Sequence, residues 1–386
     1  QNDGADSVGV VSAMGHARLM ATGSLFGVDV YWGTTNAGTN VLQWSNRVSM
    51  GVFSNVVLTN LSQLFGDLQS ETTYYFTFSA TNCATASWSA VDRFLTDTAP
   101  LSFSNRMKIT FCGYNKPATL TNFPALVSLG THRAGFDYAR FASPAGNDLR
   151  FFDGTGSFEL DYEIDIWNTN GESLIWVKVP RLVDSNTCIY AYWGQPALAG
   201  AVEAYTTNGA TWSEGYEGVW HMSQTNPLDS SPFQRHGLAT GAPEVRTNGI
   251  GRSLWFDNAN DFIRIPGYRG ITGADPRSMS VWINNNQNED DAILSWGQNV
   301  ARRKWVYRTH TDGRLRVEVN GGNVRSQPGW TDGLWHHGAF VWSDDGTPDI
   351  NDGLHYVDGT FSRQGGTAEP VDTASDQEVR IGSDAF

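Results

Sequence analysis

Two carboxylates with strand spacing are the residues of this sequence that come closest to a hydrolytic pair. Glu163 and Asp165 lie two positions apart in the stretch 162–167, so a β-strand would place both on one face. Retaining glycosidases need two carboxyl groups about 5–5.5 Å apart, flanking the bond that is cleaved. A Glu-x-Asp-x-Glu pattern would supply them, but Trp167 stands at its third position. The sequence therefore predicts no catalysis at this strand.

Other motifs that carry enzyme chemistry are absent from the sequence. It has no His-Glu-x-x-His, no Gly-x-Ser-x-Gly and no P-loop. His336 and His337 are adjacent, and neighbours on a strand point to opposite faces, so the two rings are poorly placed to bind one metal ion. We predict one inward and one outward histidine, and a chain that is not an enzyme.

A basic segment is the most informative local feature. Residues 302–325 carry seven Lys and Arg against two acidic residues, in a chain whose net charge is −14. If 311–313 forms a three-residue hairpin loop with a left-handed Gly313, Arg308 lies opposite Arg316 and His310 lies opposite Arg314. The core face of the hairpin would then carry Trp305, Tyr307, Leu315, Val317 and Val319. A two-residue loop would bury Arg308, so the hydrophobic pattern favours the longer loop.

Like charges directly opposite one another destabilise a strand pair, so this hairpin needs acidic neighbours or an anionic ligand. A solvated face balanced by the acidic background remains the alternative. Tryptophan side chains can stack on sugar rings, and Trp296 and Trp330 are the candidates because they lie beside Gly-rich loops. Trp282, Trp335 and Trp342 instead have the spacing of core residues. The candidate ligand-binding residues are Arg308, His310, Arg314, Arg316, Arg325, Trp296 and Trp330.

The elements that must position these residues are short strands. The 386 residues are rich in Gly, Thr, Ser and Asn turns and in aromatic residues, which predicts an all-β chain of several domains. No apolar run is long enough to cross a membrane, so we expect no insertion of this segment.

The net negative charge argues against nucleic acid as a partner. Cys83, Cys112 and Cys188 cannot all pair, and whether Cys112 bonds Cys188 is left open.

The first two modules resemble known domain families. Residues 68–82, followed by Phe94 and Thr96, resemble the fibronectin type III signature, which implies that Tyr74 is a tyrosine-corner residue bonding back to the backbone. The segments 105–111, 122–130, 147–153, 160–167, 173–180 and 187–194 resemble, in this order, a domain family of unknown function that accompanies LamG modules in bacterial surface proteins.

The third module carries the most specific resemblance. GVWHM, SLWFDNANDFIRIP, SMSVWI, DGLWHHGAFVW, LHYVDG and VRIG follow the order of LamG, a concanavalin A-like jelly roll. The resemblance implies a final strand beyond Phe386, a surface that binds glycans, including sulfated ones, and calcium at the rim of the sandwich in some members. Asp257 and Asp261 are the candidate calcium ligands, and solvated turn residues are the alternative.

We therefore predict three tandem β-sandwiches: a fibronectin type III-like domain over 1–98, a linker over 99–104, a sandwich of unknown function over 105–205 and a C-terminally incomplete LamG jelly roll over 206–386. The expected function is non-catalytic binding or adhesion outside the cell or on its surface, with a sulfated or uronic-acid glycan as ligand. A structural surface or appendage component that contacts other surface proteins is one alternative. An accessory region of a carbohydrate-active enzyme is the other.

Overall fold

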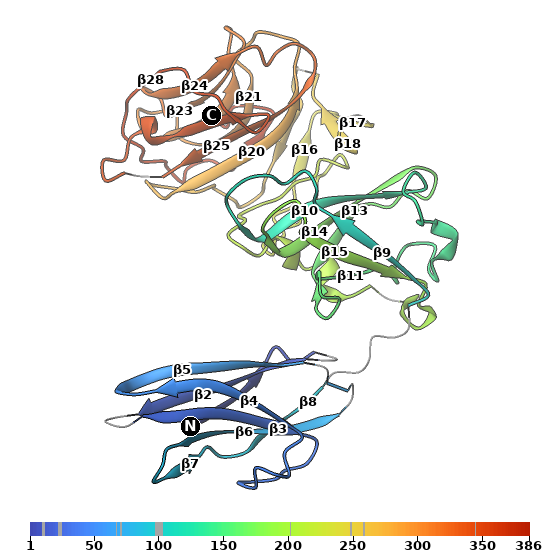
Figure 1. Cartoon of the computed structure of the whole chain (residues 1–386). Helices are drawn as coiled ribbons and strands as arrows, with labels where there is room; N and C mark the ends of the chain where they lie inside the picture. The colour runs from blue at the N-terminus through green and yellow to red at the C-terminus, as the bar shows by residue number, and fades with distance from the viewer. Residues whose placement is uncertain are drawn as a thin grey trace. The chain divides into compact units, whose positions relative to one another are not determined.

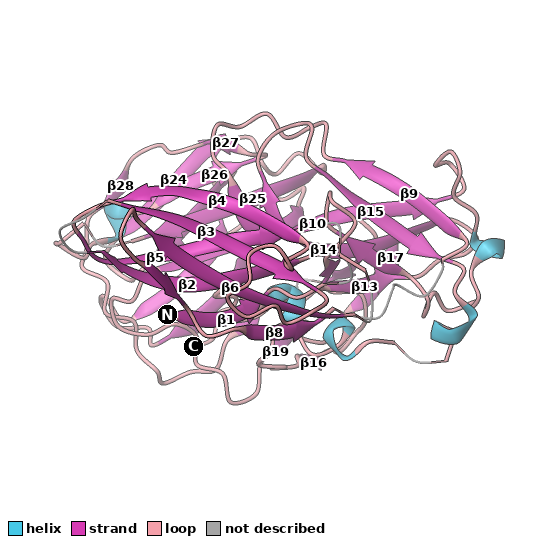
Figure 2. Cartoon of the chain, turned by 60° about the horizontal axis from the view of Figure 1, so that its bottom comes forward, coloured by secondary structure: helices cyan, strands magenta, loops and turns pink. Residues whose placement is uncertain are grey.

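The computed structural model describes residues 1–9, 12–21, 25–66, 68–69, 72–96, 103–200, 202–247, 249–257, 259–343 and 345–386. The prediction of an all-β chain is confirmed, since strands dominate the described residues (Figure 2). The helical parts are short 3-10 turns: η1 (Tyr138–Arg140), η2 (Pro196–Leu198), η3 (Ala204–Thr206), η4 (Ala210–Trp212) and η5 (Ile350–Asp352). None of the helices described here is long and apolar enough to cross a membrane.

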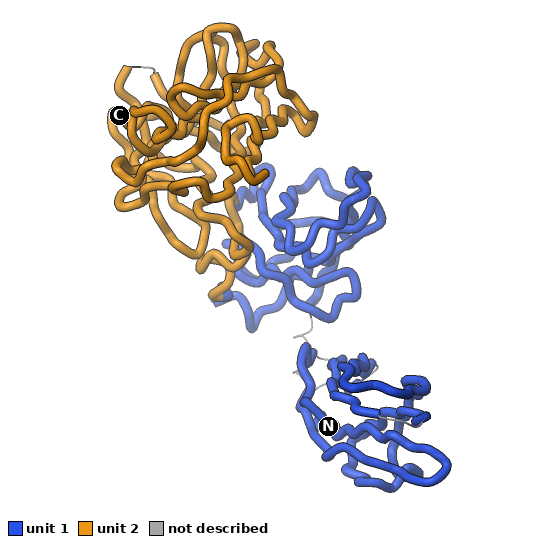
Figure 3. Tube along the Cα trace, turned by 90° about the vertical axis from the view of Figure 1, so that its left-hand side faces the viewer, with its two compact units in different colours: residues 1–162, 167–203 blue, residues 163–166, 204–386 orange. Residues whose placement is uncertain are grey.

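The chain divides into two compact units (Figure 3). Unit 1 consists of Gln1–Tyr162 and Trp167–Glu203, and unit 2 of Glu163–Ile166 and Ala204–Phe386. Unit 1 contains an N-terminal sandwich and most of a middle sandwich, and unit 2 contains the C-terminal sandwich together with residues Glu163–Ile166 of the middle one. Most of the predicted linker, 99–104, lies outside the described residues.

The N-terminal sandwich consists of two antiparallel sheets (Figure 1). One sheet has the order β1-β2-β5 and the other β4-β3-β6-β7, with β8 also paired to β6. The strands are β1 (Asn2–Asp6), β2 (Ala13–Ala21), β3 (Phe26–Gly33), β4 (Asn46–Phe53), β5 (Val56–Phe65), β6 (Thr73–Thr81), β7 (Ala86–Trp88) and β8 (Asp92–Leu95). Alternation along β2 places every second residue in the core, as expected of a strand with one buried face.

Tyr74 closes one corner of this sandwich. Its ring is buried beside Phe94, and its hydroxyl accepts a hydrogen bond from the backbone N–H of Gln69 at 3.0 Å. The hydroxyl of Thr96 donates to the carbonyl of Gln69 at 2.6 Å. The backbone contact expected of a tyrosine-corner residue is therefore present, while membership of the fibronectin type III family stays a prediction.

The middle sandwich also has two sheets, in the orders β10-β14-β13 and β12-β11-β15-β9. Its strands are β9 (Asn105–Thr110), β10 (Leu120–Gly130), β11 (Arg150–Phe152), β12 (Glu159–Leu160), β13 (Tyr162–Ile166), β14 (Glu172–Leu182) and β15 (Cys188–Trp193). Asp148 is fully buried, and its carboxylate accepts hydrogen bonds from the backbone N–H groups of Ala142, Ser143, Gly194 and Gln195. This carboxylate fixes the loop before β11 against the end of β15.

The C-terminal sandwich packs an eight-stranded sheet on a four-stranded one. The larger sheet has the order β16-β19-β29-β21-β22-β23-β24-β28, the smaller β20-β25-β26-β27, and β17 pairs β18. The strands are β16 (Leu238–Thr240), β17 (Glu244–Thr247), β18 (Arg252–Trp255), β19 (Phe262–Arg264), β20 (Arg277–Asn284), β21 (Ala292–Gly297), β22 (Lys304–Thr309), β23 (Arg314–Glu318), β24 (Asn323–Pro328), β25 (Trp335–Trp342), β26 (Leu354–Val357), β27 (Thr360–Phe361), β28 (Gly366–Thr367) and β29 (Arg380–Ile381).

Its core lies between these two sheets. Trp305, Tyr307, Leu315 and Val317 of the larger sheet meet Phe340 and other apolar side chains of the smaller sheet in one buried cluster. The opposite face of β22 and β23 consequently points away from this core, because side chains alternate along a strand.

Candidate functional site

The hairpin β22–β23 has the register predicted from the sequence. Tyr307 lies opposite Val317, Arg308 opposite Arg316 and Thr309 opposite Leu315. Gly313 has a φ of +75° and donates its N–H to the carbonyl of His310 at 2.9 Å, which closes a three-residue loop. The five apolar residues predicted for the core face, Trp305, Tyr307, Leu315, Val317 and Val319, are all buried.

Three arginines stand opposite one another on the other face. Arg308 of β22 pairs with Arg316 of β23, and Arg316 pairs with Arg325 of β24, so a row of guanidinium groups crosses three neighbouring strands. The side chains are 10%, 19% and 32% exposed, respectively. Partial burial weakens the screening of their mutual repulsion by water, so the row needs negative charge close by.

Two carboxylates of the chain supply part of that charge. Glu318, which is buried, lies 2.6 Å from Arg316 Nη2 and 3.7 Å from Arg308 Nη1, and it also pairs with Lys304. Asp312 in the hairpin loop contacts three of the candidate residues, with atoms 2.8 Å from His310 Nδ1, 2.9 Å from Arg314 Nη1 and 3.8 Å from Arg325 Nη1. We call the five candidate residues Arg308, His310, Arg314, Arg316 and Arg325 the arginine face.

The pKa shifts show the same balance of charge. Burial alone would raise the pKa of Glu318, but the hydrogen bond from Lys304 and the nearby cationic charges hold this pKa below its usual value. Burial lowers the pKa of Arg316, and although Glu318 opposes the effect, the charges of Arg325 and Arg308 lower it further. The arginines therefore repel one another even with Glu318 in place.

The arginine face also has unused hydrogen-bond donors. The Nε atoms of Arg308, Arg314 and Arg316 are buried and have no acceptor among the described residues. Buried donors are normally satisfied by protein, water or a bound ion. Three such donors on adjacent strands therefore mark a place where water or an anionic group would be bound.

The two tryptophans proposed as sugar platforms differ in their positions. Trp296 is 4% exposed, lies 5.9 Å from the ring of Trp305 and donates its indole N–H to the carbonyl of Ile271, so the prediction of an exposed platform is wrong for this residue. Residues directly opposite one another in a strand pair share a face, and the partner of Trp296 is Trp305, which lies in the core. Trp330 is half-buried, and its backbone N–H donates to the carbonyl of Gly313, which places it beside the hairpin loop.

An exposed tryptophan occurs on the opposite sheet instead. Trp282 is 48% exposed and lies 5.2 Å from the ring of His337, its partner across the strands. The sequence placed Trp282 in the core, but Met279, Val281 and Ile283 occupy the inward positions of β20. His336 is buried and bonded to Asp358, so the prediction of opposite orientations for the two adjacent histidines agrees with the structure.

The candidate calcium ligands have other partners. Asp261 is buried and accepts from the backbone N–H groups of Ala242 and Asp257, at 2.6 and 3.2 Å. Asp257 accepts from the N–H of Ala259 at 2.9 Å. The described residues contain no group of three or more His, Cys, Asp or Glu side chains that could hold a metal ion. These two carboxylates cap their own loops, and a calcium site at them stays a prediction.

Glu163 and Asp165, the pair with hydrolase-like spacing, contact a histidine. Glu163 accepts hydrogen bonds from Trp212 Nε1 at 2.6 Å and Ser230 Oγ at 2.5 Å, and it lies 3.4 Å from His221 Nε2. Asp165 lies 3.8 Å from His221 Nδ1. Burial lowers the pKa of His221, but the two carboxylates outweigh that effect and raise it. The sequence reasoning missed His221, which is distant from both carboxylates in the chain.

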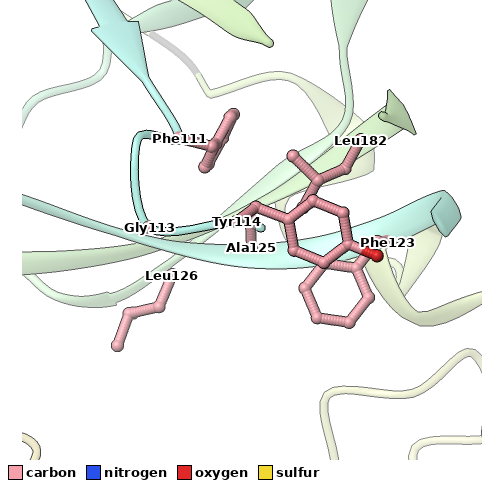
Figure 4. Close-up of a pocket in the computed structure, with 7 residues that line it drawn as sticks. All are labelled: Phe111, Gly113, Tyr114, Phe123, Ala125, Leu126 and Leu182. Carbon is pink, nitrogen blue, oxygen red and sulfur yellow. The ribbon is translucent and has the colours of Figure 1, made fainter. Parts of the chain in front are cut away.

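The middle sandwich has a hollow of a different kind (Figure 4). It measures about 260 Å³, and its lining contains no charged side chain. The loop beside it is closed by a hydrogen bond from the hydroxyl of Tyr114 to the carbonyl of Ala118. The lining residues are Phe111, Gly113, Tyr114, Phe123, Ala125, Leu126 and Leu182. Its apolar chemistry is unrelated to that of the arginine face.

The three cysteines are free thiols. Cys83 and Cys112 are exposed and Cys188 is half-buried. Cys188 lies opposite Thr110 on β9, and Cys112 follows beyond the end of that strand. The structure therefore contains no bond between Cys112 and Cys188, which the sequence had left open.

Comparisons with known proteins identify two of the three modules. Residues 257–386 match the concanavalin A-like lectin/glucanases superfamily, in the family Laminin_G_3, and residues 145–218 match a domain of unknown function, DUF2341. The resemblances of the second and third modules are thereby confirmed. No curated protein sequence matches the chain.

Two solved structures are similar to part of the chain. One is the sensor domain, in a short form, of the anti-sigma factor RsgI4 of Pseudobacteroides cellulosolvens, with 19% identity, a TM-score of 0.19 and coverage of 25% of this chain and 92% of that one. The other is the solution structure of the same sensor domain, with 18% identity, a TM-score of 0.19 and coverage of 26% and 78%. At this TM-score the likeness carries no weight for function.

Proposed function

We propose that this chain is a non-catalytic binding protein that acts outside the cell or on its surface, and that its arginine face recognises an anionic polysaccharide. The family of the third module supports a carbohydrate-binding role, since its description names lectins and glucanases. The observation that carries the proposal is the row of Arg308, Arg316 and Arg325 across three strands. The buried Nε–H groups of Arg308, Arg316 and the neighbouring Arg314 have no acceptor among the described residues. Sulfate and carboxylate groups are the natural acceptors for guanidinium donors.

The absence of catalysis is part of the proposal. Glu163 is occupied by three donors, Trp212, Ser230 and His221, and the third position of the hydrolase-like pattern is Trp167, whose indole donates to the carbonyl of Pro144. A retaining glycosidase needs a second carboxyl group at that position to protonate the leaving group.

A glycan-array screen of the whole chain at low and high salt, with and without calcium, tests the proposal. We expect binding to uronic-acid or sulfated glycans that weakens as salt rises, because the attraction between exposed charges is screened by ions. The arms with and without calcium test Asp257 and Asp261 as metal ligands, because a bound ion there would make binding depend on calcium. Equal binding to neutral glycans, or none to any glycan, would overturn it.

Matched variants locate the site. The double change Arg314→Ser and Arg316→Ser should weaken binding about tenfold and flatten its salt dependence, if each contact contributes about 0.7 kcal/mol. The control is Arg246→Ser with Arg303→Ser, which removes the same charge from β17 and from the segment before β22. If the two double variants bind alike, the arginine face is not the site.

Contact with another protein is a second candidate function, favoured by the outer face of the smaller sheet. Trp282, Val341, Leu354 and Phe361 are all exposed there, between 37% and 55%. Exposed tryptophan and clustered apolar residues are typical of protein interfaces. Sedimentation over a concentration series would test self-association, which the change Trp282→Ser with Phe361→Ser should abolish.

A further inference from the structure

The segment that follows β29 lies against the arginine face. β29 is an inner strand of the larger sheet, between β19 and β21. Gly382 then takes a φ of +86° and donates its N–H to the carbonyl of Ile293, so the chain turns out of the sheet. The carbonyl of the next residue, Ser383, accepts a hydrogen bond from the hydroxyl of Ser295 at 2.7 Å. Ser295 belongs to the same face as Arg308, because it lies opposite Val306, two positions before that arginine.

Asp384 reaches the first arginine of the row. Arg308 Nη2 donates to both carboxylate oxygens of Asp384, at 2.9 and 2.7 Å. Arg380 Nη1 donates to the backbone carbonyl of Asp384 at 3.1 Å, which holds this residue in place. Ala385 is buried and Phe386 lies 5.8 Å from the ammonium group of Lys304. The chain therefore places a carboxylate of its own on the face that lacks acceptors.

We propose that the position at Arg308 is built for a carboxylate, and that Asp384 is an internal occupant which competes with the uronic-acid groups of the polysaccharide. This inference rests on the proposed function of the arginine face and names both the ligand group and its regulation. The planar guanidinium group matches a carboxylate in two-point contact. Arg308 remains able to donate from Nε, so an incoming carboxylate has a second donor that Asp384 does not use. The side chain of Asp384 is 41% exposed, which leaves it free to be displaced.

The test is the change Asp384→Asn in the whole chain, with polygalacturonate as the probe. Asparagine has the same shape but no charge, so the packing of Ala385 is kept while the competitor is weakened. We expect the affinity to rise about two- to fivefold, the range that corresponds to loss of a partly exposed ion pair. The control is Asp372→Asn, which frees Arg303 from an exposed ion pair and changes the net charge equally.

A third variant assigns any gain to Arg308. The double change Arg308→Gln with Asp384→Asn should lose the gain of Asp384→Asn, since the freed donor is then missing. If Asp384→Asn binds no more tightly than Asp372→Asn, the competition is refuted while the proposed function stands. If the wild-type chain and both asparagine variants fail to bind, the proposed function is wrong and the competition falls with it.

Discussion

Removing the central carboxylate of the arginine face should destabilise the C-terminal sandwich strongly. Glu318 is buried among Lys304, Arg308 and Arg316, and the change Glu318→Gln keeps its shape while deleting its charge. Breaking a buried ion pair by removing one partner costs about 3–5 kcal/mol, since the other charges stay behind. The side chains of these partners are between 10% and 19% exposed, so water solvates their charges in part and reduces this cost. We expect the free energy of unfolding to fall by about 2–3 kcal/mol.

The assay is denaturant unfolding followed by hydrogen exchange of β22 to β24, which reports this sandwich separately from unit 1. The matched control is Glu244→Gln, whose carboxylate is 60% exposed and pairs with Arg246, so its loss should cost less than about 1 kcal/mol. Salt should reduce the deficit of Glu318→Gln by screening the remaining cations. If the two variants are equally stable, Glu318 does not balance the arginine row and the reasoning is refuted.

The remaining predictions concern one buried histidine and one hydroxyl. Burial lowers the pKa of His355 to about 3. The unfolded state therefore binds a proton at this residue below about pH 6.5 and the folded state does not, so stability falls as the pH drops from about 6.5 towards 3. His355→Leu should remove about 2 kcal/mol of that loss at pH 5, and an unchanged pH dependence would contradict the assignment. Tyr74→Phe should cost about 1 kcal/mol in the N-terminal sandwich, because the N–H of Gln69 loses its acceptor. Tyr75→Phe, on the half-buried neighbouring residue, is the control, and equal stability of the two variants would refute a role for the hydroxyl.

The elements and the register of the hairpin could be predicted because they depend on local information. The alternation of apolar residues on either side of Gly313 allows one loop length that keeps Arg308 off the apolar core face, and the structure has that register. The orientation of Trp296 could not be predicted in this way. A bulge between Ala292 and Leu294 resets the alternation of β21, and Trp296 then faces Trp305.

The partners of the candidate residues were harder to predict because they come from distant parts of the chain. Asp384 lies 76 residues after Arg308 in the chain and reaches it only because β29 inserts next to β21. His221 reaches Glu163 across 58 residues. In the sequence Glu318 is one of two acidic residues among seven basic ones, and its role depends on its burial, which a single sequence does not reveal.

The central claim is that the arginine face binds an anionic polysaccharide through donors that the chain leaves unused. Nitrogen-15 NMR of the arginine Nε–H groups during a titration with polygalacturonate tests it most directly. We predict that the signals of Arg308, Arg314 and Arg316 shift together and saturably, and that the shifts disappear at high salt, whereas the signal of Arg246 stays in place. Saturable binding that leaves these three signals unmoved, while the indole signal of Trp282 shifts, would contradict the account.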